Sequence, residues 1–281
     1  MVDIAIVGTG AAGVSAALTL QALKKNFIWF GNKRLSEKIR KAELIRNYPG
    51  LSSVSGEEMG RVFLRQIEEA GIEITEKTVT GVYKMRDHYV VMCDQESYQA
   101  KTVILTTGVE AVKPITGELE LMGRGVSYCA TCDGFLYKGK TIGVVCASKE
   151  FEHEIEYLAQ LAEKVYLVAL YKNVAVQAKN VELVKGMPLA VVGEKKVEAL
   201  TFKDKELPLS GVFFLKSAIT PSVLVPGLEV ADGHIVVNRA CQTNFKGCFA
   251  AGDCTGRPYQ YIKAAGEGNV AAHSAVKFLA E

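Results

Sequence analysis

The chain has 281 residues, of which 49% are hydrophobic and 23% are charged, and its formal net charge is +2. This is the composition of an ordinary globular protein, and the length is sufficient for two domains. The small net charge gives no reason to expect a nucleic acid partner. No apolar run approaches the roughly 18 residues of a membrane span, so we expect no membrane partner and a cytoplasmic location.

The chain contains seven cysteines, and only Cys129 and Cys132 form a CxxC pair. An odd number of cysteines in a chain of this size argues against the disulfide framework of a small secreted protein. A zinc site made of four cysteines needs a second such pair, so we expect no metal site.

The chain begins with a strand, a glycine turn and a helix. An apolar run from Ile4 to Val7 is followed by 8-GTGAAG-13, by a helix to about Lys24 and by the strand 27-FIWF-30. The later segments predict further helices and strands. We expect helices over 56–70 and 261–279, strands near 102–108, 141–145, 165–170, 211–215, 234–238 and 247–253, and a hairpin around 193–196.

Three glycines of the first turn predict a dinucleotide cradle. Gly8 permits the tight turn, Gly10 lets the backbone approach a pyrophosphate, and Gly13 lets the helix pack closely on the strand. The N-terminus of the following helix then faces the phosphate charge.

A second strand and helix, 141-TIGVVCASKEFEHEIEYLAQL-161, have the same architecture without the glycines. Cys146 and Ser148 carry side chains where a pyrophosphate needs close backbone approach, and Phe151 is too large for the close-packing position. Four glutamates, Glu150, Glu152, Glu154 and Glu156, suit the dipole at the start of the helix but oppose an incoming phosphate. The pattern predicts a nucleotide-binding architecture that no longer binds a nucleotide.

The cysteine pair lies in 125-GVSYCATCDGFLY-137. A CxxC pair closes a small disulfide ring that is readily reduced and reoxidised. Asp133 directly follows Cys132 and is placed to exchange a proton with a thiol. Half of a metal site and two buried thiols are the alternatives. A redox dithiol in a chain with a dinucleotide fold favours flavin chemistry.

Taken together, CATCDG after GVSY, the later FAAGD and 260-QYIKAAGEGNVAA-272 resemble the low-molecular-weight thioredoxin reductases over nearly the whole chain. The resemblance implies a homodimer with an α/β fold of two Rossmann-like, three-layer ββα domains. The FAD-binding domain would be discontinuous, with residues 1–112 and 217–281. A central domain, residues 113–216, would be inserted in it, would carry the CxxC pair and would normally bind NADPH.

The resemblance also implies roles for individual residues. Cys132 would lie nearest the flavin, Cys129 would complete the dithiol, and Asp133 would assist; which cysteine attacks thioredoxin stays open. Asp253 would bind the ribityl chain of FAD. The full set of expected FAD contacts is Gly8, Gly10, Ala11, Ala12, Gly13, Gly31, Asn47, Val79, Thr107, Gly108, Gly252, Asp253, Gln260, Tyr261 and Ile262.

The chain departs from this family in the central domain. Besides the turn at 146–151, Leu170 and Tyr171 stand where two arginines would hold the 2′-phosphate of NADPH. These departures resemble the ferredoxin-dependent flavin thioredoxin reductases of anaerobes. The expected activity is FAD-dependent reduction of thioredoxin with electrons from ferredoxin. A donor at roughly −400 mV and an acceptor at roughly −270 mV make the transfer of two electrons favourable by about 6 kcal/mol.

The stretch 33-KRLSEKIRKAELIR-46 has six basic and two acidic residues. We expect Lys33, Arg34, Lys38, Arg40 and Lys41 to steer an acidic ferredoxin towards the flavin. A solvated helix face is the alternative.

Two other functions stay open: an NAD(P)H-dependent disulfide reductase with an atypical nucleotide site, and a flavoprotein redox sensor without turnover.

Overall fold

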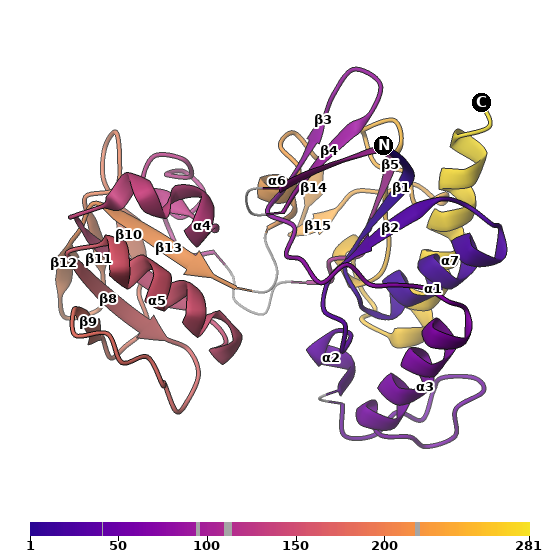
Figure 1. Cartoon of the computed structure of the whole chain (residues 1–281), viewed down its shortest axis with the longest axis horizontal. Coiled ribbons are helices and arrows are strands. Elements are labelled where there is room, and N and C mark those ends of the chain that lie inside the picture. The colour runs from indigo at the N-terminus through magenta and orange to yellow at the C-terminus, as the bar shows by residue number, and fades with distance from the viewer. Residues whose placement is uncertain (41, 94–95, 110–113, 217–219) are drawn as a thin grey trace. The chain divides into compact units, whose positions relative to one another are not determined.

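The computed structural model describes residues 1–40, 42–93, 96–109, 114–216 and 220–281 (Figure 1). The chain forms two compact units. The terminal unit comprises residues 1–109 and 220–281, and the inserted unit comprises residues 110–219. The expected boundaries at 112/113 and at 216/217 fall in or beside stretches outside the described residues, so the domain limits stay a prediction.

The terminal unit is built on one mixed sheet to which both ends of the chain contribute. Its described strands follow the order β2-β1-β5-β4-β3, and β16 also pairs with β5. Strands β1, β2 and β16 are parallel to their neighbours, whereas β3 and β4 are antiparallel. The bounds are β1 Val2–Val7, β2 Phe27–Phe30, β3 Gly81–Lys84, β4 Tyr89–Cys93, β5 Glu96–Leu105 and β16 Cys248–Ala250.

Helices α1 (Ala11–Ala22) and α7 (Tyr261–Phe278) pack side by side, as Figure 1 shows, and share one core with Ile6 and Phe249. A side chain at Gly268 of α7 would place its Cβ 2.1 Å from the carbonyl oxygen of Ala12, so glycine is required for this close crossing. The other elements of the unit are α2 Glu37–Arg40, α3 Gly56–Glu69, α6 Pro221–Leu224, β14 Val230–Ala231 and β15 His234–Ile235.

The inserted unit contains a parallel sheet of order β6-β13-β7-β8-β9 and an antiparallel sheet of order β10-β11-β12. Helix α5, Glu152–Leu161, follows β7, and α4, Ala130–Asp133, follows β6. The strand bounds are β6 Val126–Ser127, β7 Thr141–Cys146, β8 Lys164–Ala169, β9 Val181–Leu183, β10 Ala190–Val192, β11 Ala199–Thr201, β12 Glu206–Pro208 and β13 Gly211–Leu215.

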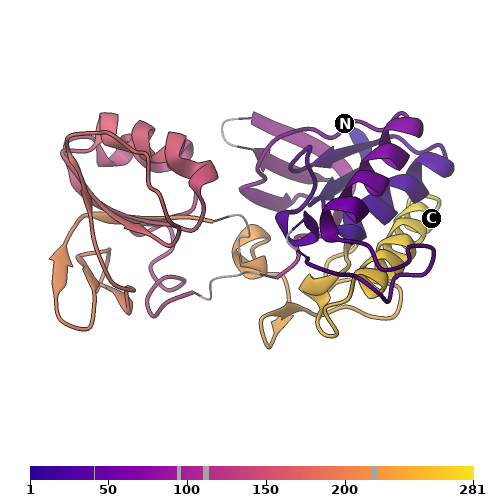
Figure 2. The ribbon, with the colours of Figure 1, turned by 90° about the horizontal axis from the view of Figure 1, so that it is seen from below.

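Neighbouring residues of the parallel strands face opposite layers. Val144 and Phe213 pack in the core with α5, whereas Val145 and Phe214 pack in the core with the antiparallel strands. Figure 2 shows the helices on one side of this sheet and the orange antiparallel strands on the other. Burial on both faces explains why these strands read as continuous apolar runs. The predicted α/β class with Rossmann-like, three-layer units is confirmed.

Two expected elements differ in detail. The strand expected over 234–238 is limited to β15, because Asp232 and Gly233 form a tight turn with φ of 49° and 76° that pairs only two residues on each side. The helix predicted after the strand at 141–145 begins later than the positions of its glutamates suggest. A 3-10 turn occupies Lys149–Phe151, and α5 starts at Glu152.

Within the described ranges, no helix has the length and apolar character needed to cross a membrane. The same residues contain no cluster of three or more side chains of the types that bind metals.

A buried ion pair joins the start and the end of the inserted unit. The ammonium of Lys216 lies 2.6 Å from the Glu118 carboxylate, and the two side chains are 5% and 1% exposed. The same carboxylate accepts hydrogen bonds from the Ile115 N–H, at 3.0 Å, and from the Tyr128 hydroxyl. Lys216 also lies 5.0 Å from the centre of the Tyr128 ring. The Glu118 carboxylate therefore connects the segments that contain Ile115, Tyr128 and Lys216.

Replacing Lys216 by methionine should lower the stability of the inserted unit by about 3 kcal/mol, because an unpaired carboxylate is then left buried. The double variant Lys216→Met/Glu118→Gln removes both charges. Its amide keeps an oxygen acceptor for the Ile115 N–H and an NH2 group that can donate to the Tyr128 hydroxyl, so it should recover more than half of the loss. Urea unfolding followed by far-UV circular dichroism measures the change. The fluorescence of Trp29, the single tryptophan, reports on the terminal unit separately.

The matched control is Lys164→Met, which removes a pair with Glu182 whose side chains are 40% and 58% exposed. Exposed pairs contribute at most about 1 kcal/mol, so this variant should unfold close to the parental midpoint. A parental midpoint for Lys216→Met would show that the buried pair does not stabilise the unit.

Candidate functional site

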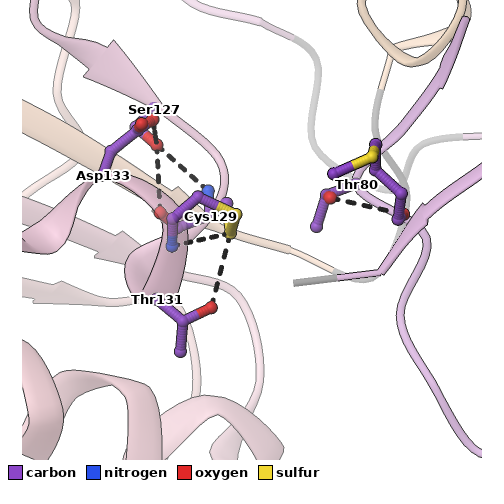
Figure 3. The surroundings of a disulfide bond; sticks show 7 residues. Thr80, Ser127, Cys129, Thr131 and Asp133 are labelled. Atoms are coloured by element: carbon purple, nitrogen blue, oxygen red, sulfur yellow. Dashed lines mark hydrogen bonds between the residues drawn. A yellow bond between two sulfur atoms is a disulfide. The ribbon is translucent and has the colours of Figure 1, made fainter. Parts of the chain in front are cut away.

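Cys129 and Cys132 are joined by a disulfide, with their Cα atoms 5.3 Å apart (Figure 3). Cys129 is the residue that caps the short helix α4, and its Sγ accepts the Cys132 N–H at 3.1 Å. Cys129 is buried at 8% exposure, whereas Cys132 is exposed. The pair predicted as a dithiol is thus oxidised here, with one of the two residues accessible on the inserted unit.

The carboxylate next to the disulfide is held in place by a residue that sequence reasoning missed. Ser127 is the last residue of β6 and is 2% exposed. Its hydroxyl donates a hydrogen bond to the Asp133 carboxylate, with 2.6 Å between the two oxygens. The Ser127 hydroxyl oxygen also accepts the Cys129 N–H at 3.1 Å (Figure 3). Ser127 therefore orients both Asp133 and the backbone of Cys129. The only signal in the sequence is its place in GVSYC.

Two large apolar side chains are exposed directly after the disulfide. Phe135 and Leu136 are 67% and 64% exposed on the 3-10 turn Gly134–Tyr137. Their neighbour Tyr137 is anchored instead, with its ring 5.3 Å from that of Phe213. Adjacent exposed apolar residues beside a reactive group are typical of a protein-binding surface. Sequence reasoning did not single out this pair.

In the terminal unit, two residues distant in sequence hold the first turn of the glycine loop. Gly8 has a φ of 111°, and a Cβ there would lie 2.4 Å from the Thr106 carbonyl oxygen. Its own carbonyl accepts hydrogen bonds from Trp29 Nε1 at 2.8 Å and from Thr106 Oγ1 at 2.9 Å. Trp29 and Thr106, from β2 and the end of β5, therefore position the turn.

The glycine loop and the start of α1 fit an anionic ligand. A Cβ at Gly13 would lie 2.1 Å from the Gly8 carbonyl oxygen, so packing within the chain requires Gly13. Gly10 is different, because its φ is −79° and no described residue lies within 4 Å of the place that its Cβ would take. Ala11 and Ala12 begin α1, whose first turn has no acidic side chain. An open helix N-terminus of this kind suits the diphosphate of FAD.

Of the other expected FAD contacts of this region, Gly31, Thr107 and Gly108 follow the carboxyl ends of β2 and β5, whereas Val79 precedes β3. A Cβ at Gly31, after β2, would lie 2.6 Å from Thr9 Cγ2 in the glycine loop. Thr107 and Gly108 follow β5, whose end is held at β1 because the Thr106 N–H donates to the Val7 carbonyl at 2.8 Å. Val79 is buried, at 7% exposure. Ligands bind at this edge of parallel sheets, where the carboxyl ends of the strands meet.

The structure also brings together expected flavin contacts that lie far apart in the sequence. Asn47 Nδ2 donates to Gln260 Oε1 at 2.5 Å, across 213 residues. Tyr261 donates from its hydroxyl to the Lys38 carbonyl oxygen at 2.8 Å. Ile262 is 42% exposed. Lys38 and Asn47 thus contact the start of α7 in the terminal unit.

Asp253 follows Gly252 after β16. Burial raises the pKa of its carboxyl group above the usual value, and the ammonium groups of Lys38 and Lys263 act in the opposite direction. The adjacent thiol of Cys254 is 1% exposed, and burial raises its pKa to about 11. This thiol therefore stays protonated and inaccessible, whereas the Asp253 carboxyl group is only partly buried.

In the inserted unit, the turn between β7 and α5 carries polar side chains that hydrogen-bond within the chain. The N–H of Glu150 donates to the Ser148 hydroxyl, at 3.4 Å, so a side chain caps the 3-10 turn that precedes α5. Glu152, the first residue of α5, is held against the segment after β8, since its Oε1 accepts the Tyr171 hydroxyl at 3.0 Å and the Ala175 N–H at 2.8 Å. A carboxylate therefore lies at the start of this helix, where its charge opposes a phosphate.

One detail of the sequence argument needs correction. Cys146 is fully buried, in the core shared with Ile155 of α5. Its Sγ donates to the Ser148 carbonyl oxygen at 3.2 Å, and burial raises its thiol pKa to about 11. The Cys146 side chain is therefore buried beneath the turn, which leaves Ser148 as the more accessible of the two side chains that were expected to block a pyrophosphate.

The basic stretch of residues 33–46 is less uniform than its sequence suggests. Lys33, Arg34 and Lys38 are exposed, but Lys38 Nζ donates to the Val109 carbonyl at 2.7 Å. Arg40 is half-buried, with its guanidinium 3.9 Å from the Glu37 carboxylate. Lys41 lies outside the described residues. Helix α2 covers Glu37–Arg40, so Lys33 and Arg34 lie outside it and do not share a helix face with Lys38 and Arg40.

Comparisons with known proteins agree with this geometry. A family model described as pyridine nucleotide-disulphide oxidoreductase matches residues 2–268. A thioredoxin reductase of Helicobacter pylori (strain J99 / ATCC 700824) is 33% identical, and the alignment covers 99% of each chain. Two solved structures of a ferredoxin-flavin thioredoxin reductase from Clostridium acetobutylicum have TM-scores of 0.93 and 0.91. They are 44% and 48% identical, over 99% of this chain and 97% and 98% of theirs.

The family match spans both units, and the relative from Helicobacter aligns over its whole length. The oxidised Cys129–Cys132 pair and the open glycine loop at Gly10 are the two features that a flavin-dependent disulfide reductase requires. The chain therefore belongs to the pyridine nucleotide-disulphide oxidoreductase family and, within it, to the FAD-dependent thioredoxin reductases.

Proposed function

We propose that the chain reduces the disulfide of a thioredoxin with electrons that a ferredoxin delivers to its FAD. One observation supports the choice of donor: the turn after β7 has no glycine and carries the Ser148 hydroxyl and the Glu152 carboxylate, both hydrogen-bonded within the chain, while the disulfide is intact. The Clostridium acetobutylicum structures, whose name states a ferredoxin-flavin enzyme, support the same choice.

The residues have separate tasks in this proposal. The glycine loop at Gly8–Gly13 and the carboxylate of Asp253 hold FAD, which supplies the capacity to collect single electrons and pass on a pair. Two electrons and two protons convert the Cys129–Cys132 disulfide into two thiols. Thiol–disulfide exchange then reduces thioredoxin and re-forms the Cys129–Cys132 bond. Asp133, oriented by Ser127, holds or returns a proton beside this pair.

The remaining parts of the proposal rest on the resemblance and on charge. Lys33 and Arg34 are the exposed cations best placed to attract an acidic ferredoxin, with Lys38 and Arg40 partly engaged in the chain's own contacts. Lys41, outside the described residues, stays part of the proposed dock. We include a homodimer and a cytoplasmic location in the proposal.

Anaerobic reduction of the flavin by each donor in turn tests the donor. Reduced ferredoxin should bleach the visible flavin absorbance rapidly at low ionic strength and more slowly at high salt, because exposed charges steer the encounter. NADPH and NADH should leave the absorbance unchanged over the time of one turnover.

Rapid bleaching by NADPH would contradict the proposal and favour a reductase with an atypical nucleotide site. If no donor reduces the flavin of the unsubstituted protein, and the protein does not turn over thioredoxin, the protein would instead be a redox sensor. A thioredoxin-coupled assay on the same preparation separates these two outcomes.

The exposed apolar pair should contribute to recognition of the protein substrate. Truncation of both side chains, Phe135→Ala/Leu136→Ala, should raise the KM for thioredoxin about tenfold, because each loses apolar area that the partner would bury. Flavin reduction by ferredoxin should keep its parental rate. The control is Leu183→Ala, a residue of the same unit that is 54% exposed on the edge strand β9. Equal KM values for the parent and the double variant would remove the pair from the docking surface.

Asp253→Asn should have opposite effects on stability and on cofactor binding. The folded-state pKa of Asp253 is raised, so its charged form costs stability above that pKa, and the cost vanishes below the pKa of the unfolded chain, about 3.9. The apoprotein variant should therefore melt at a higher temperature than the parent at pH 7, and the advantage should disappear as the pH falls towards 4. The Kd for FAD should rise about tenfold, since a charged acceptor for the ribityl hydroxyls is lost.

The control for this substitution is Asp232→Asn in an exposed turn of the same unit. It should change neither the melting temperature at pH 7 nor the Kd for FAD. A destabilised Asp253→Asn apoprotein at pH 7 would mean that the carboxylate is a net stabilising group and not a strained one.

A further inference from the structure

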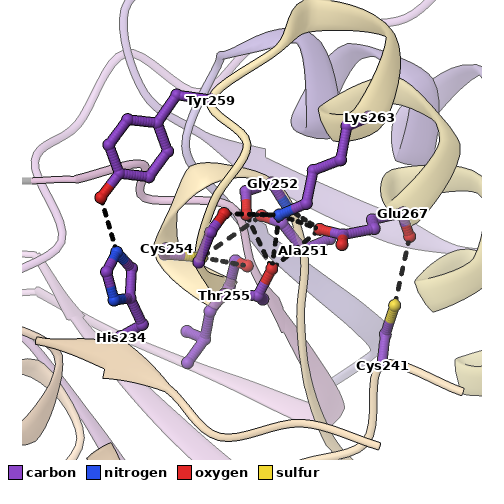
Figure 4. A network of polar contacts seen from close by, with 11 residues as sticks. His234, Cys241, Ala251, Gly252, Cys254, Thr255, Tyr259, Lys263 and Glu267 are labelled. Atoms are coloured by element: carbon purple, nitrogen blue, oxygen red, sulfur yellow. Dashed lines mark hydrogen bonds and ion pairs between the residues drawn. The ribbon is translucent and has the colours of Figure 1, made fainter. Parts of the chain in front are cut away.

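Lys263 and Glu267, one turn apart on α7, are the centre of a polar network around the loop that follows β16 (Figure 4). Their side chains are 19% and 28% exposed, and the ammonium lies 2.9 Å from the carboxylate. Neither residue was singled out from the sequence, although both lie within the family-like stretch 260–272. Pairs on a helix surface are usually well solvated, so their partial burial calls for an explanation.

The ammonium of Lys263 binds the loop at both of its ends. Nζ donates to the carbonyl oxygens of Gly252, at 2.8 Å, and Gly256, at 2.9 Å, and lies 2.9 Å from the Thr255 hydroxyl. With Glu267 this makes four oxygen atoms around a group with three protons. Carbonyl oxygens that converge in this way repel each other unless a cation lies between them.

The carboxylate of Glu267 binds the same loop from its donor side. Its Oε2 accepts the Gly252 N–H at 2.8 Å and lies 2.8 Å from the Thr255 hydroxyl. Lys263 and Glu267 thus hold both the N–H and the C=O of Gly252 (Figure 4). Gly252 has φ of 90° and ψ of −151°, a conformation that is essentially restricted to glycine. Glycine also has access to many other conformations, so the contacts of Lys263 and Glu267 select this one.

This loop is in contact with the glycine loop of the terminal unit. A Cβ at Gly252 would lie 3.0 Å from Ala12 Cβ, at the start of α1. Asp253, the next residue, is the carboxylate whose pKa burial raises. The position of Gly252 therefore determines where Asp253 lies relative to the open helix N-terminus at Gly10.

We propose that Lys263 and Glu267 are positioning residues that hold the loop of residues 252–256 in the conformation that binds FAD, by gripping both polar groups of Gly252. The inference rests on the FAD cofactor of the proposed function and not on its electron donor. A parent that binds FAD but accepts no electrons from ferredoxin would refute the proposed function and leave this inference standing.

Titration of FAD into the apoprotein tests the positioning role. Lys263→Met and Glu267→Ala should each raise the Kd for FAD about tenfold or more, because each removes charge-assisted hydrogen bonds to the loop. Glu267→Gln keeps an oxygen acceptor for Gly252 and should stay within about threefold of the parent. The visible circular dichroism of the flavin, measured at saturating FAD, should change in Lys263→Met and Glu267→Ala, since the cofactor's surroundings are altered.

Two further variants separate positioning from plain stability. Lys277→Met, an exposed lysine in the last turn of α7, should match the parent in every measurement. Thr255→Val removes one hydroxyl from the network at nearly constant volume and should raise the Kd with little effect on the melting temperature of the apoprotein. Parental Kd values for Lys263→Met and Glu267→Ala would overturn the proposal. A second result would also overturn it. In that result, Lys263→Met and Glu267→Ala lower the melting temperature of the apoprotein, while Thr255→Val keeps the parental Kd and flavin spectrum.

Discussion

The pairing of β16 with β5 is the interaction on which the cofactor site depends. Cys248, Phe249 and Ala250 lie opposite Val103, Ile104 and Leu105 in parallel register. Since the strands of this part of the sheet run in the same direction, their carboxyl ends share one edge, and the loops after β1, β5 and β16 converge there. Without this pairing, Gly252 and Asp253 would have no reason to lie near Gly8 and Thr107. Gly268 then allows α7 to approach Ala12 and close the same region from the helix side.

The two units use one architecture with opposite outcomes at this edge. In the terminal unit the space beside Gly10 is open and the first turn of α1 carries no acidic side chain. In the inserted unit Ser148 caps the 3-10 turn that precedes α5, and Tyr171 binds Glu152, the first residue of α5. The Glu150 N–H is satisfied by the chain itself, and the Glu152 carboxylate adds repulsion towards a phosphate. The inserted unit can therefore keep its packing and its disulfide while losing a ligand.

Charge is arranged around the loop of residues 252–256 at some cost to stability. Asp253 is partly buried with a raised pKa, and the cations that oppose the shift come from α7 and from the segment after β2. Lys263 and Glu267 satisfy the polar groups of Gly252, whose backbone only glycine adopts readily. Strain that the surrounding contacts over-determine is typical of binding sites, where local preference and function diverge.

The sequence by itself determined the order of most elements, the glycine loop, the CxxC pair and the loss of the second nucleotide turn. These features depend on spacing within a few residues, which local periodicity and steric rules describe well. The tertiary structure decided the contacts between distant segments: Asn47 with Gln260, Ser127 with Asp133, and Lys263 and Glu267 with Gly252. It also decided that Cys146 faces the core and that Phe135 and Leu136 face solvent. Side-chain direction and pairing across up to 213 residues follow from how the sheets and helices pack, and no pattern along the chain encodes them.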